Sequence, residues 1–155
     1  MNDIERQTIR GFLNNNFNLY NCFGFTGDLK QYDKSYGYLD KIKVSRNTKR
    51  FLNYLNYKVY KNSFRRHNKR LKVIPTIEGG WKSDKRYHVH LVMELPDTNI
   101  ISNKDFYSLF FNCWDKTYYS YSHPKVEQYI DHGWIDYITK FKEKDDFVDW
   151  DNTTV

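Results

Sequence analysis

The sequence predicts an α+β fold, an antiparallel β-sheet of about five strands with helices packed on one face. Apolar runs of strand length occur at 19–26, 71–78 and 86–95, and two longer segments repeat apolar residues at helical spacing. The order strand, helix, strand, strand, helix, strand is that of a split βαβ sandwich, as in ferredoxin-like and RRM-like folds. With 155 residues and no second composition regime, we expect a single domain over 1–155.

The first half of the chain supplies a strand and a long helix. Residues 19–26 are rich in aromatics and end at Gly27-Asp28, as expected of a strand that enters a turn. The segment 34–44 fits either a loop or an edge hairpin. A long basic amphipathic helix is predicted from Ser45, whose side chain can cap it. The apolar stripe of this helix is Phe51, Leu52, Leu55 and Val59.

The next part of the chain supplies a hairpin and a second helix. The runs 71–78 and 86–95 flank a loop that contains Gly79 and Gly80, which favours a hairpin. Ser102, followed three residues later by Asp105, resembles a capping box with Asp in place of Glu. We therefore expect the second helix to begin there.

The end of the chain is predicted to add a strand over 126–130 and a short helix over 134–141, separated by Gly133. The tail from about residue 143 is acidic, and we expect it to be loosely held. Cys22 and Cys113 lack metal-ligand spacing and are expected to be buried free thiols. No segment has membrane-spanning length or the pattern of a secretion signal, so a cytosolic location in the host cell is expected.

Positive charge is concentrated in the middle of the chain. There are 25 Lys and Arg against 19 Asp and Glu, a formal charge of +6, and no acidic residue occurs from Lys41 to Lys72. Tyr and Phe are interleaved with these cations, a composition that neutralises phosphates and offers rings for base stacking. An ordinary solvated helix face is the alternative interpretation. The candidate DNA-binding residues are Lys49, Arg50, Lys58, Lys61, Arg65, Arg66, Lys82 and Arg86.

His88 and His90 are two residues apart in an otherwise apolar run. Alternate side chains of a strand share a face, so both imidazoles project together, opposite to Val89 and Leu91. If the apolar side packs under the helices, the histidines point to the open face of the sheet. With Glu78 of the neighbouring strand as a third ligand, they suit a divalent metal, Mn²⁺ or Mg²⁺, that acts as a Lewis acid.

Tyr137 and Lys140 are three residues apart on the predicted last helix, and therefore share a face. A phenol with a pKa of about 10 is a poor nucleophile at neutral pH unless it is oriented and its charge is stabilised. Lys140 is placed to offset negative charge on a phosphate or phenolate. A metal, a tyrosine and a lysine together indicate phosphoryl-transfer chemistry.

Three motifs in this order resemble the HUH superfamily of single-stranded DNA endonucleases, in which U is a bulky hydrophobic residue. His88-Val89-His90 matches the histidine motif. Tyr137-Ile138-Thr139-Lys140 is similar to the single-tyrosine motif of Rep proteins, the rolling-circle replication initiators of plasmids and small viruses. Residues 23–28 are similar to the first motif of the family, and the resemblance spans roughly 19–142.

The resemblance implies cleavage of a single-stranded origin, which leaves a free 3′-OH and a 5′-phosphotyrosine on Tyr137 and is followed by rejoining. His88, His90 and Glu78 would hold the metal, and Lys140 would assist. The first motif departs from the commoner pattern at Gly27-Asp28, so neither Thr26 nor Asp28 is assigned a catalytic role. The chain has no phosphate-loop motif, so a helicase and a polymerase would be encoded separately.

Two other functions fit the same pattern. A non-catalytic, RRM-like module that binds single-stranded nucleic acid would need neither a metal nor Tyr137. A mobile-element transposase with the same chemistry would differ from a replication initiator only in its substrate. The oligomeric state cannot be read from the sequence.

Overall fold

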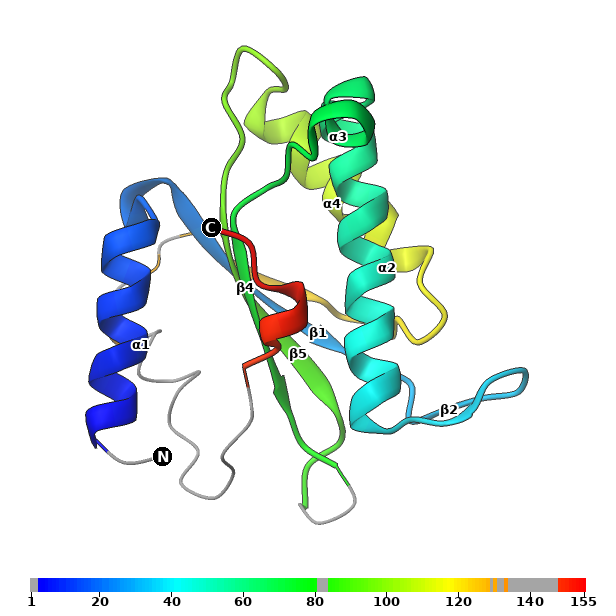
Figure 1. Cartoon of the computed structure of the whole chain (residues 1–155). Helices are drawn as coiled ribbons and strands as arrows, with labels where there is room; N and C mark the ends of the chain where they lie inside the picture. Colours follow the sequence, from blue (N-terminus) through cyan, green and yellow to red (C-terminus); the bar gives the residue numbers. More distant parts are fainter. Residues whose placement is uncertain (1–2, 81–83, 129, 131–132, 134–147) are drawn as a thin grey trace.

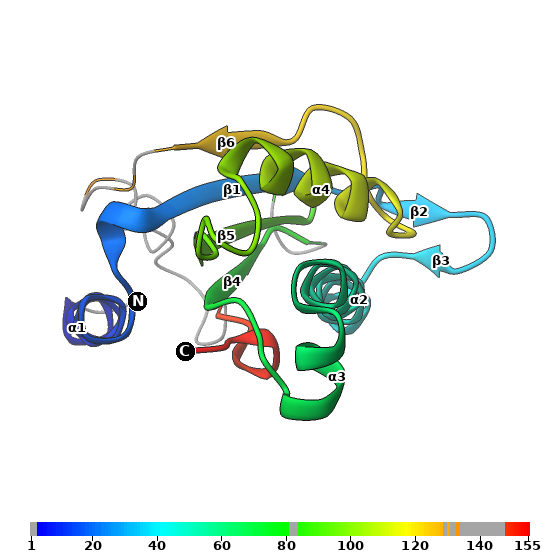
Figure 2. The ribbon, with the colours of Figure 1, turned by 90° about the horizontal axis from the view of Figure 1, so that it is seen from above.

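The main sheet has four antiparallel strands in the order β4-β5-β1-β6, of which Figure 1 labels β4, β5 and β1 and Figure 2 labels all four. The computed structural model describes residues 3–80, 84–128, 130, 133 and 148–155. The strands are β1 (Cys22–Asp28), β4 (Val73–Glu78), β5 (His88–Glu94) and β6 (Lys125–Glu127). The predicted α+β class is confirmed, although the described residues give this sheet four strands where about five were expected.

Helices α2 (Lys41–Tyr60) and α4 (Asn103–Asp115) pack together over one face of the sheet (Figure 2). The side chains of alternate strand residues meet them there, and Phe25 contacts the ring of Phe110 edge to face at a centroid distance of 4.9 Å. The fully buried strand residues on this face are Phe23, Phe25, Val89, Leu91 and Met93. Because side chains alternate along a strand, this core turns His88 and His90 to the opposite face, as predicted.

The two long helices begin at side-chain caps. Ser102 accepts a hydrogen bond from the backbone N–H of Asp105 at 3.1 Å, which confirms the predicted start of α4. The predicted start of α2 at Ser45 is wrong, because the Asp40 carboxylate caps the helix through the N–H of Lys43 at 2.8 Å. An aspartate caps as well as a serine does, and the helix therefore gains one further turn before Ser45.

Helix α1 (Asp3–Asn16) packs against the face opposite to α2 and α4 (Figure 2). Ile9 and Leu13 of α1 form a second buried cluster with Cys22 of β1 and Val92 of β5. The expectation that helices occupy only one face is therefore wrong for α1. These contacts lie at the end of the sheet where β1 begins and β5 ends, away from the two histidines.

Smaller elements connect the main ones. A 3₁₀ turn, η1 (Leu19–Asn21), precedes β1, and the short helix α3 (Asn62–His67) follows α2. Residues 34–44 were expected to form either a loop or an edge hairpin. The structure has an edge hairpin of β2 (Tyr32–Asp33) and β3 (Gly37–Tyr38), which begins just before this segment, and the segment ends in the start of α2.

The end of the chain lies along β4. Val148 bridges to Thr76 and Thr154 bridges to Val73, on either side of a 3₁₀ turn, η2 (Trp150–Asn152). The expectation of a loosely held tail is therefore wrong for residues 148–155. The loose tail was inferred from its acidic composition, and composition gives no information on backbone pairing with the edge of β4.

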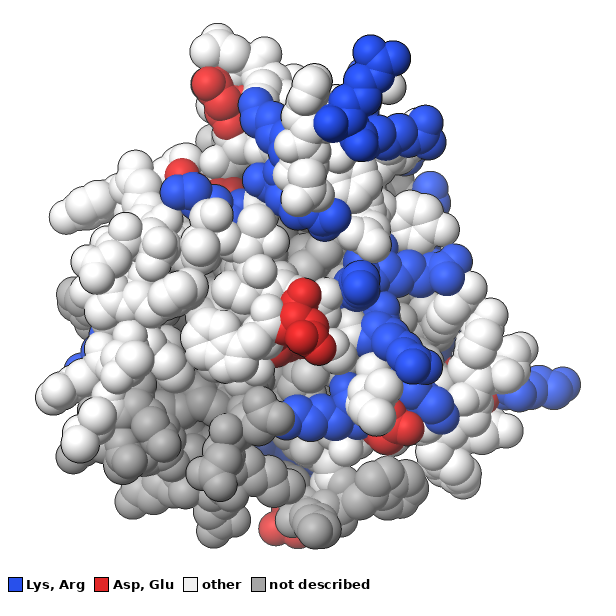
Figure 3. Space-filling model, viewed as in Figure 1, with Lys and Arg blue, Asp and Glu red and all other residues white. Residues whose placement is uncertain are grey.

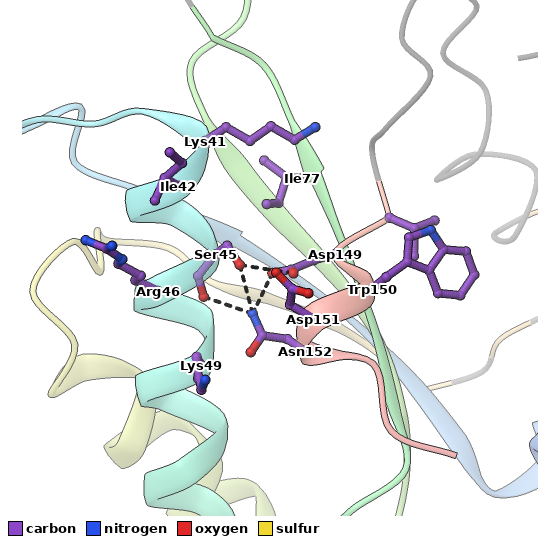
Figure 4. Close-up of a pocket in the computed structure, with 11 residues that line it drawn as sticks. Lys41, Ile42, Ser45, Arg46, Lys49, Ile77, Asp149, Trp150, Asp151 and Asn152 are labelled. Carbon is purple, nitrogen blue, oxygen red and sulfur yellow. Dashed lines mark hydrogen bonds between the residues drawn. The ribbon is translucent and has the colours of Figure 1, made fainter.

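A groove of about 760 Å³ lies between the start of α2 and this C-terminal segment (Figure 4). Ser45 donates a hydrogen bond to Asp149 at 3.0 Å, and the Asn152 side-chain amide donates to Asp149 at 2.7 Å. The groove has charges of both signs, from Lys41, Arg46, Lys49, Asp149 and Asp151.

The remaining expectations concern the last third of the chain. The strand expected at 126–130 corresponds to β6, and the helix expected at 134–141 lies outside the described residues. Within the described part of the chain, no helix has both the length and the apolarity needed to cross a membrane.

Candidate metal centre

Glu78, His88 and His90 converge at one end of the sheet. The Nε2 atoms of both histidines lie 3.0 Å from the same carboxylate oxygen, Oε2 of Glu78. The two imidazole rings are nearly perpendicular, with centroids 4.9 Å apart. One ligand atom from each of the three residues fits within 4.8 Å of the others. The predicted ligands therefore come together.

The hairpin between β4 and β5 creates this convergence. Its register pairs Glu78 with His88 and Thr76 with His90, so all four side chains are on the same face of the sheet. Gly79 follows β4 with a φ of +93°, and a side chain there would collide with the backbone of Arg86. Glycine thus lets the chain turn immediately after Glu78.

The second nitrogen of each imidazole also has a partner. His90 Nδ1 lies 2.8 Å from the Thr26 hydroxyl, and His88 Nδ1 lies 2.9 Å from the Arg86 carbonyl. A carbonyl only accepts, so Nδ1 of His88 donates to it and Nε2 is the nitrogen left for a metal. The Thr26 hydroxyl can accept from His90 in the same way, and such contacts fix the orientation of metal-binding imidazoles.

Burial and mutual contacts set the charges of the centre. Burial would raise the pKa of Glu78, but hydrogen bonds from His88, His90 and Lys85 outweigh it and hold this pKa well below its usual range. Burial would lower the pKa of His88, yet the contacts with Glu78 and the Arg86 carbonyl raise it overall. Burial is the largest influence on His90 and lowers its pKa. The carboxylate is therefore ionised, and His90 is the more readily neutral imidazole.

This donor set fits a divalent cation. Two imidazoles and one carboxylate form a mixed nitrogen and oxygen set that leaves coordination positions for water and phosphate oxygens. The side chains of His88 and Glu78 are 15% and 12% exposed, whereas that of His90 is 2% exposed, so the centre opens to solvent on one side. The three residues could hold a metal ion.

Three further residues near the centre were not predicted as site residues. Thr26 orients His90, and Lys85 donates a hydrogen bond to the second oxygen of Glu78 at 2.9 Å. Lys125 of β6 pairs with Thr26, so this exposed cation is on the same face, two strands from His90. Side chains alternate between the two faces in β1 and β6 as they do in β5. Thr26 and Lys125 could not be assigned to the histidine face from the sequence, because that requires knowing how these distant strands pair.

Some of the predicted site residues lie elsewhere. Tyr137, Lys140 and Lys82 lie outside the described residues, so their positions relative to the centre stay predictions. The Arg86 guanidinium lies over the ring of Tyr121, 5.2 Å from its centroid, while its carbonyl supports His88. The other predicted DNA-binding residues are on the helical side of the sheet, away from the metal centre: Lys49, Arg50, Lys58, Lys61, Arg65 and Arg66.

Comparisons with known protein families, with curated proteins and with solved structures find no match to this chain. The chemistry of the centre itself is therefore the evidence on function.

Proposed function

We propose that this chain is a metal-dependent HUH endonuclease of the Rep type, which nicks and rejoins single-stranded DNA to initiate rolling-circle replication of a plasmid or virus. The observation that carries the proposal is the convergence of His88, His90 and Glu78 on the sheet face opposite to α2 and α4. Mn²⁺ or Mg²⁺ held by these residues would supply Lewis-acid polarisation of a phosphate.

Tyr137 is the proposed nucleophile. Its phenolic oxygen attacks the scissile phosphorus, the bond from phosphorus to the 3′-oxygen breaks, and the leaving strand takes up a proton to become a free 3′-OH. The phenolic proton passes to solvent or a nearby base, and the other strand end remains as a 5′-phosphotyrosine. Attack by an incoming 3′-OH reverses these changes, rejoins DNA and releases the tyrosine.

The surrounding cations would handle the phosphate charge. Lys140, one turn after Tyr137 in the predicted helix, is proposed to offset charge on the phosphate or the phenolate. Lys85 contacts Glu78, and its role is to position that carboxylate with one oxygen toward the histidines. Lys125 is exposed on the same sheet face and is suited to a neighbouring phosphate of the bound strand.

The partners in this proposal are single-stranded origin DNA, a helicase and a polymerase supplied separately, and the host cytosol is the place of action. A purely RNA-recognition role is less well supported, because the sheet face of such modules presents aromatic rings to bases. Here the open face of β4 and β5 carries Glu78, His88 and His90, and both histidines are hydrogen-bonded to one oxygen of Glu78.

A gel assay for covalent protein–DNA adducts tests the proposal. The purified protein is incubated with Mn²⁺ and a pool of labelled, randomised single strands, alongside Tyr137→Phe and an EDTA control. Tyr20→Phe is the matched variant, because Tyr20 is fully exposed and remote from the centre. We expect adducts from the wild type and Tyr20→Phe only.

Strand binding without any adduct would favour the non-catalytic module instead. An adduct that persists in Tyr137→Phe would move the nucleophile to another tyrosine. An adduct that forms equally well in EDTA would remove the metal from the reaction.

A further inference from the structure

The outer side of α2 and α3 carries a row of cations that do not take part in the metal centre. We call Arg46, Lys49, Arg50, Lys61, Arg65 and Arg66 the α2–α3 cationic surface. Three of them lie in the first half of α2 and three at its end and in α3, and Figure 3 shows Lys and Arg side chains over both helices. At 1.5 Å per residue, Arg46 and Lys61 are about 23 Å apart along the helix, roughly two thirds of one turn of a nucleic-acid duplex.

Carboxylates do not neutralise this surface. No acidic residue occurs between Lys41 and Lys72, and none of the six cations forms a salt bridge with a carboxylate among the described residues. Asp149 and Asp151 line the groove beside Arg46 and Lys49 and offset part of the charge at that end of the surface. Six cations against these two carboxylates leave an excess of positive charge for an external anion.

Aromatic rings hold two of the guanidinium groups in place. Arg50 lies over the ring of Tyr118 at 4.1 Å and Arg65 over the ring of Tyr57 at 4.5 Å, measured to the ring centroids. A guanidinium stacked on a ring has few accessible rotamers, so less side-chain entropy is lost when it binds a phosphate. Tyr57 is itself 37% exposed and offers part of its ring.

The sheet separates this surface from the metal centre. The inner side of α2, including Phe51 and Leu55, is buried against the strand residues that alternate with His88 and His90. A strand held at the centre and a strand held on α2 would therefore lie on opposite sides of the sheet.

We infer that the α2–α3 cationic surface is a second nucleic-acid binding site, which holds a phosphate backbone independently of the metal centre. The repeating charge of such a backbone matches cations spread over about 23 Å of helix, from Arg46 to Lys61, and continued into α3. A membrane surface fits less well, because an interfacial helix inserts an apolar face, and that face of α2 is buried in the core. The inference does not require that the protein cleaves DNA.

The experiment measures how the binding of nucleic acid depends on salt, with EDTA present to silence the metal centre. Fluorescence anisotropy is recorded with a labelled single strand and, separately, with a labelled duplex. The surface variant combines Lys49→Gln, Lys61→Gln and Arg66→Gln. The matched control combines the exposed Lys30→Gln, Lys104→Gln and Lys116→Gln, so that both variants carry a formal charge of +3, three less than +6.

We expect the surface variant to reduce the slope of log affinity against log salt by about three, on the order of one for each lost phosphate contact. The control should retain the wild-type slope apart from a small general charge effect. The nucleic acid that shows the larger change, single strand or duplex, is the one that the surface holds.

Three outcomes would overturn the inference. These are an unchanged slope in the surface variant, an equal loss in the control, and binding to anionic phosphatidylserine vesicles in place of either nucleic acid. Covalent adduct formation at Tyr137 is measured separately, so failure of the nicking proposal and failure of this inference are distinguishable.

Discussion

The contact between Thr26 and His90 gives a sharp test of the metal centre. The Thr26→Val substitution keeps the shape of the side chain and removes the hydroxyl that lies 2.8 Å from Nδ1 of His90. Nδ1 of His90 then loses this hydrogen-bond partner, although the His90 side chain is only 2% exposed and offers it little contact with water. Leaving a buried polar group unsatisfied costs about 1–3 kcal/mol, and loss of such a supporting contact weakens metal binding by roughly 10- to 100-fold.

Thr76 provides the matched control. It is paired with His90 on the other side, in β4, and is buried, but its hydroxyl has no hydrogen-bond partner among the described residues. Thr76→Val should therefore leave the affinity for Mn²⁺ unchanged, because it removes no contact of the centre.

Isothermal titration with Mn²⁺ measures both variants against the wild type. We expect the dissociation constant to rise about 10- to 100-fold for Thr26→Val and to stay within about twofold for Thr76→Val. Wild-type affinity in Thr26→Val would refute the role of this hydroxyl. Equal losses in both variants would show that packing around His90, and not its hydrogen bond, decides the affinity.

Three other predictions concern the fold. Gly27→Ala should destabilise the protein by about 1–3 kcal/mol, because the added methyl group would collide with the rings of Phe25 and Trp114. Gly11→Ala in α1 has open space around it and should not destabilise the protein. Urea denaturation measures both variants, and the opposite ranking of their stabilities would contradict this packing. Asp40→Ala should cost about 1 kcal/mol in the same assay through loss of the α2 cap, and an unchanged midpoint would show that the cap contributes nothing. Burial and, secondly, the charge of Glu94 raise the pKa of Cys22 to about 12, so this thiol stays protonated at pH 8. It should therefore react with Ellman's reagent far more slowly in the native protein than after unfolding. Rapid labelling of the native protein would mean that α1 does not cover Cys22.

Local patterns predicted the central part of the fold. The alternation in β5 and the cap at Ser102 depend on neighbours in the sequence, so both could be predicted without knowing the rest of the chain. Helix α1 was missed because its residues are mostly polar, although Ile9 and Leu13 already show helical spacing. Ser45 was misassigned because its partner, Asp149, is far away in the sequence.

The candidate site shows the same division. Glu78 and His88 are close in the sequence and belong to one hairpin, so their convergence could be predicted. The support from Thr26 depends on how β1 pairs with β5, which no local pattern specifies. The position of the basic helix could also be predicted, because its apolar stripe faces the shared core and thereby places the helix on the side of the sheet opposite to the histidines.

The most direct test of the account is to identify the residue that becomes linked to DNA. Wild-type protein is incubated with Mn²⁺ and single strands, digested with a protease and a nuclease, and the modified peptide is sequenced by mass spectrometry. The account predicts a nucleotide attached through a 5′-phosphate to Tyr137 and to none of the other 13 of the 14 tyrosines. Attachment to a different tyrosine, or cleavage that yields only free 5′-phosphate ends without a linked peptide, would contradict it.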